Sequence, residues 1–458
     1  MNLHAPPLFV PPRPEVPTQE LGWYQTLAVL RTNALQMWSQ EAYEKDLLVQ
    51  YFLGRKRFQL NAPDAIHHVL VHNAANYTRT PATFRILGPI VGNGLLLSEG
   101  EEWRHQRRTI APALAPRIIP MLTRHVAAAT ATSLARLTAC ADGREVDLLA
   151  AMQFLALDIA ARSMFSLEIQ RHGAALRSMI ARFGMRLGRP YFLDLMLPRG
   201  IPTPHDLARW RFRSEWIALM DEIIESRLSA PKSEGPRDLF DVLLAARDPE
   251  TGAAFSRAQL RDQLATMIVA GHETTALTLF WSLYLLASAP AEQERLAQDL
   301  RAIDLDPDHA ADALPKLAYT RAVVDEALRL YPPAFVIVRK AIAPDQVSGV
   351  TIPKGALVSI APWVLHRHVR LWKDPDAFNP SRFLGEAPKA HRFAYLPFGA
   401  GPRVCVGSQF ALAEATLVLA SLIQRFEIAL ADDTPVLPVG IVTTQPGHPA
   451  PFRLRLRD

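Results

Sequence analysis

Apolar residues recur at helical spacing through most of this chain. From about residue 100 to about residue 320 the pattern repeats every three to four positions. It is interrupted mainly at 187–204 and 228–238, where proline, glycine and charged residues gather. The segments 262–287 and 407–426 each predict a long apolar helix. The middle of the chain is therefore expected to be almost entirely helical.

Short segments with the alternation of β-strands flank this helical region. They are 47–52 with 57–60, 347–352, 357–360 and 441–456, of which the first pair and the last segment predict hairpins. A helix is expected from Pro63 onward, directly after the first hairpin. We therefore expect a mainly α fold with small β-sheets, preceded by a proline-rich arm at 1–20.

Composition narrows the class of protein. The chain has 458 residues, of which 49% are hydrophobic, so it can bury a sizeable core. Two cysteines far apart in the sequence cannot form a disulfide framework, and this indicates a reducing compartment. No stretch of 18 or more apolar residues and no signal-peptide pattern is present. We expect a cytoplasmic protein without a membrane anchor.

The net charge of +5 leaves two interpretations of the basic residues open. No basic patch interleaved with aromatic residues and no nucleic-acid motif is found, so nucleic acid is not expected as a partner. The basic residues are then either an ordinary solvated face or a docking face for an acidic electron-transfer protein.

The sequence Phe-Gly-Ala-Gly-Pro-Arg-Val-Cys-Val-Gly at 398–407 carries the strongest chemical signal. Cys405 stands directly before the helix expected at 407–426, where the helix dipole and free backbone N–H groups stabilise a thiolate. An electron-rich sulfur in such a loop suggests thiolate ligation of haem iron. Cys140 has no neighbouring motif and is interpreted as a small buried hydrophobe.

The spacing Phe-x-x-Gly-x-Arg-x-Cys-x-Gly resembles the haem-binding loop of the cytochrome P450 monooxygenases. The resemblance implies their fold, a single triangular domain at 21–458, and about fifty residues after the cysteine leave no room for a fused reductase. It implies haem b and O2 as cofactors and Cys405 as the ligand of the iron. The other cofactor-binding residues that it implies are Trp103, Arg107, Arg339, Phe398, Gly399, Arg403 and Gly407.

A second motif, Ala-Gly-His-Glu-Thr-Thr at 270–275, interrupts the apolar helix. The hydroxyl of Thr274 can donate to the carbonyl of Ala270, which favours a local distortion of the helix. Alone, such a cluster is more often a cap or a buried polar group. Beside the cysteine loop it matches the family's acid–alcohol pair, so the resemblance implies catalytic roles for Glu273 in proton supply and for Thr274 in oxygen activation.

Three charged residues extend the resemblance. Glu326 and Arg329 are three positions apart on one expected helix, and Arg382 follows in the segment Phe-Asn-Pro-Ser-Arg-Phe. In the family these residues form a buried network that supports the haem loop, where removing one partner costs about 3–5 kcal/mol. Ser381 stands where glutamate is commonest in the family. The resemblance gives the three residues a structural role.

The substrate-facing positions are inferred from apolar residues in connecting segments. The expected loop at 83–97 is unusually apolar, 268–270 precede the acid–alcohol pair, 334–336 follow a Pro-Pro corner, and 442–443 lie in the terminal hairpin. Any one of these residues is more often core than pocket. The candidate pocket residues are Phe84, Ile90, Val91, Leu95, Ile268, Val269, Ala270, Ala334, Phe335, Val336, Val442 and Thr443.

Together the motifs predict a haem-thiolate monooxygenase that inserts one atom of O2 into a hydrophobic small molecule. By resemblance, the electrons come from NAD(P)H through a separate ferredoxin and its reductase, with Arg104 and Arg108 as docking candidates. The helix after Cys405 is similar to that of bacterial fatty-acid hydroxylases, so a fatty acid or a similar long apolar compound is the first expectation. Two alternatives are a peroxide-driven peroxygenase and a non-catalytic haem-binding protein.

Overall fold

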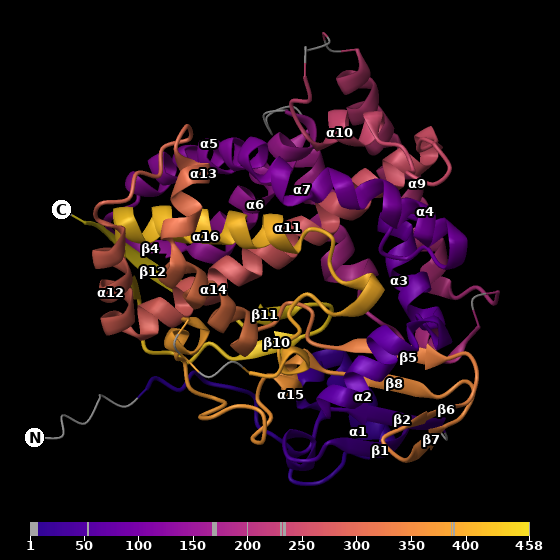
Figure 1. Ribbon diagram of the computed structural model, residues 1–458. Helices are drawn as coiled ribbons and strands as arrows, with labels where there is room; N and C mark the ends of the chain where they lie inside the picture. Colours follow the sequence, from indigo (N-terminus) through magenta and orange to yellow (C-terminus); the bar gives the residue numbers. More distant parts are fainter. Residues whose placement is uncertain are drawn as a thin grey trace, which may run out of the picture.

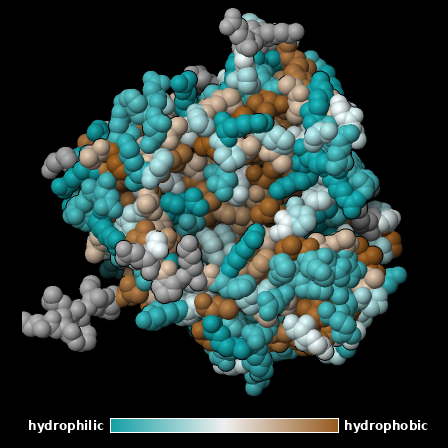
Figure 2. All heavy atoms as spheres, in the orientation of Figure 1, coloured by the Kyte–Doolittle hydropathy of each residue, from teal (hydrophilic) through white to brown (hydrophobic). Residues whose placement is uncertain are grey.

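The computed structural model describes residues 8–52, 55–166, 172–198, 200–229, 231, 235–385, 387 and 390–457. Helices make up most of the molecule, and the largest sheet lies at one corner (Figure 1). The face shown in Figure 2 is mostly hydrophilic, with hydrophobic side chains gathered towards its middle. The expected mainly α fold with small sheets is confirmed.

The helices and strands follow the chain in this order. The helices are α1 (Trp23–Thr32), α2 (Pro63–His67), α3 (Pro81–Val91), α4 (Gly100–Ile110), α5 (Ile119–Thr138), α6 (Leu148–Phe165), α7 (Gly173–Arg182), α8 (Phe192–Met196), α9 (Pro204–Leu228), α10 (Leu239–Ala245), α11 (Arg257–Ser288), α12 (Pro290–Leu300), α13 (Ala310–Ala313), α14 (Ala318–Leu330), α15 (Pro362–Leu365) and α16 (Ser408–Arg425). The strands are β1 (Leu47–Phe52), β2 (Arg55–Leu60), β3 (Tyr77–Thr78), β4 (Asp142–Asp147), β5 (Ile337–Ala341), β6 (Asp345–Val347), β7 (Val350–Ile352), β8 (Leu357–Ile360), β9 (Phe426–Leu430), β10 (Pro438–Gly440), β11 (Thr444–Pro446) and β12 (Pro451–Leu456).

The largest sheet has the strand order β1-β2-β8-β5-β3. β1 and β2 are antiparallel, with Leu47 opposite Leu60, so the hairpin expected there is confirmed. β8 joins β2 in parallel, with Phe58 opposite Val358. The sheet therefore brings the N-terminal hairpin beside segments that lie about three hundred residues later in the chain.

Helix α11 is the central core helix and packs against α6, α16 and α14 (Figure 1). Its N-terminus is capped reciprocally: the Ser256 hydroxyl accepts from the N–H of Gln259 at 3.2 Å, and the Gln259 side chain accepts from the N–H of Ser256 at 2.9 Å. Every residue from 275 to 286 is buried. A helix buried on all sides belongs to the interior of a large domain, and α11 forms one long wall of the cavity described below.

Helix α6 is long and apolar enough to span a membrane, judged by length and composition alone. In the fold 67% of it is buried, and it packs on α11 and α5. Asp158 and Arg162 form an ion pair at 3.1 Å on this helix. Its apolar character is explained by its place in the core.

The segment 83–97 was expected to be a connecting loop, and this expectation is wrong, because its first part is helical. Thr80 caps α3 by accepting from the N–H of Thr83 at 3.3 Å, and Pro81 is the first helical residue. The helix ends at Gly92, whose φ of +60° suits glycine. The apolar residues of the helical part of this segment therefore lie on different faces of α3, and only some of them can line a pocket.

The C-terminal segment makes two separate pairings, so the single terminal hairpin expected at 441–456 is wrong. β10 and β11 form a short hairpin with Gly440 opposite Thr444. β12 lies between β4 and β9 in another sheet. The strand β4 falls within the region expected to be helical, and it is almost wholly exposed, so it lacks the alternation that marks a half-buried strand.

The described part of the proline-rich arm follows the protein surface. The carbonyl of Phe9 accepts from the N–H of Phe378 at 2.8 Å, and Arg13 forms an ion pair with Asp376 at 2.9 Å. These contacts place the arm against the segment that leads to Arg382.

Candidate active site

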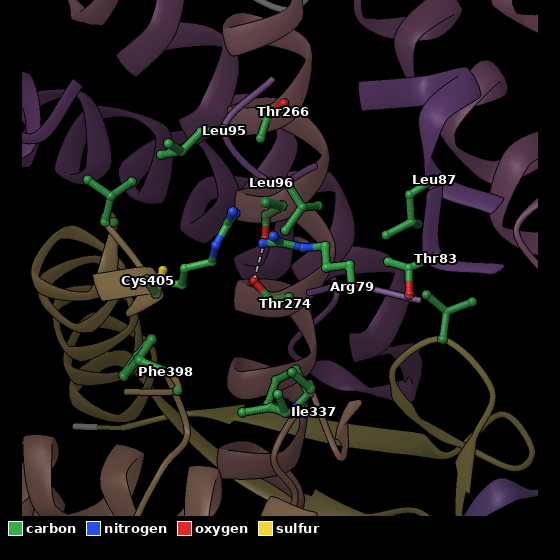
Figure 3. Close-up of a pocket in the computed structure, with 18 of the residues that line it drawn as sticks. Arg79, Thr83, Leu87, Leu95, Leu96, Thr266, Thr274, Ile337, Phe398 and Cys405 are labelled. Carbon is green, nitrogen blue, oxygen red and sulfur yellow. Dashed lines mark hydrogen bonds between the residues drawn. The ribbon is translucent and has the colours of Figure 1, made fainter. Parts of the chain in front are cut away.

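A cavity of about 910 Å³ lies between α11, α3, the β5 segment and the loop that precedes α16. Figure 3 shows Cys405 and Phe398 on one side of this cavity, Thr274 on α11, and Thr83 and Leu87 on the opposite side. All eight cofactor-binding residues expected from the resemblance line it: Trp103, Arg107, Arg339, Phe398, Gly399, Arg403, Cys405 and Gly407. Residues separated by up to 304 positions thus meet around one space.

The cysteine loop is shaped by its glycines and by one backbone bond. Gly399 and Gly401 have φ values of +70° and +73°. A Cβ at Gly401 would lie 1.9 Å from the carbonyl oxygen of Leu70, so only glycine fits there. The N–H of Cys405 donates to the carbonyl of Phe398 at 2.9 Å, which closes the loop. The loop thereby presents the Cys405 side chain to the cavity just before α16 begins.

The surroundings of the Cys405 thiol act on its pKa in opposite directions. Burial among protein atoms raises the pKa, while the N–H of Gly407 and the positive charge of Arg107 lower it. Cys405 is exposed and lines the cavity. Arg107 also donates to the carbonyl of Val404 at 2.8 Å, so this guanidinium holds the loop beside the sulfur that it stabilises.

A cationic cluster lies at one end of the cavity. Glu99 accepts from Arg79 at 3.0 Å and from Arg403. Burial, together with neighbouring arginines, lowers the pKa of Arg339 and of Arg403 to about 10, and Glu99 opposes this shift. Arg79 and Arg403 bind the Glu99 carboxylate directly, while Arg339 feels its charge without a direct contact. Three guanidinium groups and one carboxylate leave two positive charges uncompensated in this cluster.

Haem b fits the residues of this cavity. Its two propionates match the two uncompensated charges of the Arg79, Arg339 and Arg403 cluster. Haem-thiolate enzymes bind the haem iron through the sulfur of a cysteine, and Cys405 lines this cavity. The indole of Trp103 lies under the Arg403 guanidinium at 4.4 Å, which keeps that arginine in place.

The two side chains of the predicted acid–alcohol pair, Glu273 and Thr274, point in different directions. The Thr274 hydroxyl donates to the carbonyl of Ala270 at 2.6 Å, as expected, and Thr274 lines the cavity. The helix α11 is continuous through this segment, and the local distortion expected there stays a prediction. The Glu273 carboxylate accepts from the Thr443 hydroxyl at 2.8 Å and from the Gln445 amide at 2.7 Å. Glu273 therefore points to the β10–β11 hairpin.

The structure brings the three charged residues of the predicted network together. Arg329 donates to both carboxylate oxygens of Glu326, at 2.7 and 2.8 Å, and Arg382 donates to the same carboxylate at 3.1 Å. Glu326 and Arg329 are completely buried. Arg329 also donates to the carbonyls of Pro375 and Ala377, so the pair anchors the segment that precedes Arg382.

Comparisons with known proteins agree with this geometry. A family model described as cytochrome P450 matches residues 12–448. The chain is 33% identical to cyclooctat-9-en-7-ol 5-monooxygenase of Streptomyces melanosporofaciens, over 83% of this chain and 82% of the relative. It is 32% identical to pentalenene oxygenase of Streptomyces avermitilis, over 80% of each chain. The chain belongs to the cytochrome P450 family.

Solved structures support the same assignment. The haem domain of cytochrome P450DA superposes with a TM-score of 0.81 and 26% identity, over 98% of each chain. The expected P450 fold and the monooxygenase class are thereby confirmed. Use of haem and O2 follows from membership of the family.

The candidate pocket residues of this P450 divide into two groups. Those that line the cavity are Leu95, Ala270, Ala334, Val336 and Val442. Those that do not are Phe84, Ile90, Val91, Ile268, Val269, Phe335 and Thr443. Most of the second group pack in the hydrophobic core, because the faces of α3 and α11 that carry them turn away from the cavity. The structure therefore does not bring these residues to the cavity wall.

Among the cavity-wall residues that were missed from the sequence, two carry ionisable groups that bear on the chemistry of the site, Arg79 and Glu414. Arg79 lies in a short segment without a motif, and nothing in its spacing marked it. Glu414 is an acidic residue within the apolar sequence of α16, and this unusual placement could have marked it as a candidate site residue. Burial raises the pKa of Glu414 to about 8, so this carboxyl is mostly protonated at neutral pH.

Proposed function

We propose that this P450 inserts one atom of O2 into a neutral lipophilic molecule, with Cys405 as the residue that would bind the iron of haem b. The observation that carries the proposal is the meeting, in one cavity, of the Cys405 thiol, the cationic cluster and the Thr274 hydroxyl. A thiol alone, or a polar break in a helix alone, would be compatible with a structural role.

Each residue has a distinct task. When bound, haem supplies an iron centre for O2 activation, to which the Cys405 sulfur donates electron density. Arg79, Arg339 and Arg403 would hold the haem propionates. The Thr274 hydroxyl donates a hydrogen bond to the Ala270 carbonyl, so its oxygen is free to accept a hydrogen bond from a water in the cavity. Glu273 supplies protons by turning from its bonds with Thr443 and Gln445.

The cavity favours a neutral substrate of terpenoid type. Most of its wall beyond the cationic cluster is apolar, including Leu87, Leu95, Met267, Ala334 and Val336. Two relatives act on cyclooctat-9-en-7-ol and on pentalenene, by their names. These are polycyclic terpenoid compounds without a carboxylate, and a similar compound is the substrate class that we propose.

A fatty acid remains the second candidate, because Arg79 offers a cation inside the cavity. Its guanidinium shares Glu99 with Arg403, so a substrate carboxylate could compete for it. The similarity of α16 to the corresponding helix of fatty-acid hydroxylases supports the same candidate.

Spectral titrations of the holoprotein should separate these two substrates. We expect a polycyclic terpenoid alcohol to shift the Soret band on binding, and a saturated fatty acid of similar size to shift it weakly. The effect of Arg79→Leu should be equal for both ligands, because neither uses that side chain. A fatty acid that binds tightly to the wild type and at least about tenfold more weakly to Arg79→Leu, a loss of about 1.4 kcal/mol, would favour the second candidate. Lys340→Leu, at another cation of the cavity wall, is the matched control.

We propose a ferredoxin and its reductase as the route for electrons from NAD(P)H, and the cytoplasm, without a membrane anchor, as the location. Of the two docking candidates on α4, Arg108 is bound to the buried carboxylate of Asp248 at 2.9 Å and to Glu250 at 3.1 Å. Arg104 is 54% exposed and pairs only locally with Glu101. Arg104 is therefore the better candidate for contact with an acidic partner.

Charge reversal should test this docking surface. We expect Arg104→Glu to slow electron transfer from an acidic ferredoxin several-fold, mainly through association, and added salt to have a similar effect on the wild type. Stopped-flow reduction measures the rate. Arg31→Glu makes the same charge change on α1 and should leave the rate near that of the wild type. Equal effects of the two variants would mean that net charge and not this site matters.

Turnover with O2 and reductant, compared with turnover on peroxide alone, distinguishes the monooxygenase from the two alternatives. A peroxygenase works with peroxide alone, and a non-catalytic haem protein works with neither.

A further inference from the structure

His366 links the buried charge network to the cysteine loop. It follows α15 directly and is completely buried. On one side its Nδ1 lies 3.1 Å from the carbonyl oxygen of Arg329, and its own carbonyl accepts from the Arg329 guanidinium at 2.8 Å. On the other side its Nε2 lies 2.8 Å from the backbone N–H of Leu396. No other ring in the described chain joins these two segments by hydrogen bonds from both of its nitrogens.

The two neighbours determine which nitrogen carries the proton. The Leu396 N–H can only donate, so Nε2 of His366 must be the acceptor. The Arg329 carbonyl can only accept, so Nδ1 carries the hydrogen and donates. The ring is therefore a neutral bridge with a fixed tautomer, and both of its bonds lie in the interior.

From Leu396 the connection continues to the sulfur ligand through backbone bonds. The Leu396 carbonyl accepts from the N–H of Gly399 at 3.1 Å. Phe398, between them, accepts through its carbonyl from the N–H of Cys405 at 2.9 Å. Leu396 and Phe398 both line the cavity. The stretch 396–398 that His366 holds at Leu396 is thus the same stretch to which Cys405 is bonded at Phe398.

We propose that His366 is a positioning residue for the cysteine ligand, acting through Leu396 and Phe398 to hold the Cys405 sulfur toward the cavity. The buried Glu326–Arg329 pair is the rigid support. The imidazole of His366 links this support to the cysteine loop through its hydrogen bonds. This inference rests on the proposed function, because it takes Cys405 as the haem ligand.

Two substitutions separate the two bonds of the ring. The amide of His366→Gln can reach the position of Nε2 and accept from Leu396, whereas the shorter amide of His366→Asn matches Nδ1 and leaves the Leu396 N–H without an acceptor. His368 provides the matched control. It is also completely buried and bonds through Nε2 to the carbonyl of Lys45 at 3.3 Å, away from the loop.

The first readout is the CO-bound reduced holoprotein, in which the red-shifted Soret band reports thiolate ligation. We expect the band of His366→Asn to be lost about tenfold faster than that of the wild type, since the buried Leu396 N–H is left without an acceptor. His366→Gln should stay within about twofold of the wild type, and so should His368→Gln. Equal loss in the Asn and Gln variants, or equal loss in His368→Gln, would overturn the proposal.

The second readout is backbone hydrogen exchange, which does not depend on activity. In His366→Asn we expect faster exchange in a peptide spanning 394–399 and unchanged exchange in α14. Unchanged exchange at 394–399 would also overturn the proposal. If the wild type itself lacked the thiolate band, the proposed function would fail, while the exchange experiment would still decide whether His366 holds the loop.

Discussion

Replacing Cys405 with serine is expected to abolish the thiolate-type Soret band of the reduced, CO-bound protein. The alcohol of serine is a far weaker donor to iron than a thiolate, so the electron density that favours O–O cleavage is lost with the sulfur. Monooxygenase activity should fall to background in the same variant. Cys405→His should also lose the band, because a nitrogen ligand replaces the sulfur.

Cys140→Ser is the matched control for this prediction. Cys140 is half-buried just beyond α5, where its N–H donates to the carbonyl of Leu137 at 2.9 Å, and it does not line the cavity. Its replacement should leave the spectrum and the activity unchanged. A thiolate band that persisted in Cys405→Ser and disappeared in Cys140→Ser would reverse the assignment of the ligand.

Replacing Thr274 with alanine is expected to uncouple reductant consumption from product formation. The variant loses the hydroxyl oxygen that faces the cavity and that can order a proton-donating water. Haem binding and the thiolate band should survive, because neither involves this side chain. We expect the ratio of product to NAD(P)H consumed to fall about tenfold or more, with hydrogen peroxide appearing in its place.

The control for Thr274 is a second hydroxyl on the same helix. Ser282 donates to the carbonyl of Thr278 at 2.7 Å, two turns further along α11, and it does not line the cavity. Ser282→Ala should remain as tightly coupled as the wild type. Glu273→Gln should instead slow both O2 consumption and product formation, since it removes the titratable proton but keeps an acceptor for Thr443. Tight coupling in Thr274→Ala would exclude this alcohol from oxygen activation and strengthen the peroxygenase alternative.

The sequence by itself determined the cysteine loop, the helix behind it and the bond from Thr274 to Ala270. Each depends on residues within ten positions of one another, so local backbone geometry is enough to place them. The Glu326 and Arg329 pair is local in the same way, three positions apart on α14. Family resemblance added Arg382, and the fold brings it to the same carboxylate.

Only the tertiary structure decided which side chains from distant segments of the chain lie in contact. Arg79 and Arg403 meet at Glu99, and no local pattern encodes this contact, because it depends on how α3, α4 and the cysteine loop pack. The same is true of Glu273, whose bonds to the C-terminal hairpin arise 170 positions away. Helical spacing predicted apolar faces for α3 and α11, but not which face the cavity and which the core would take. His366 shows the same division: its burial and its two partners depend on two distant segments that are brought to opposite sides of one ring.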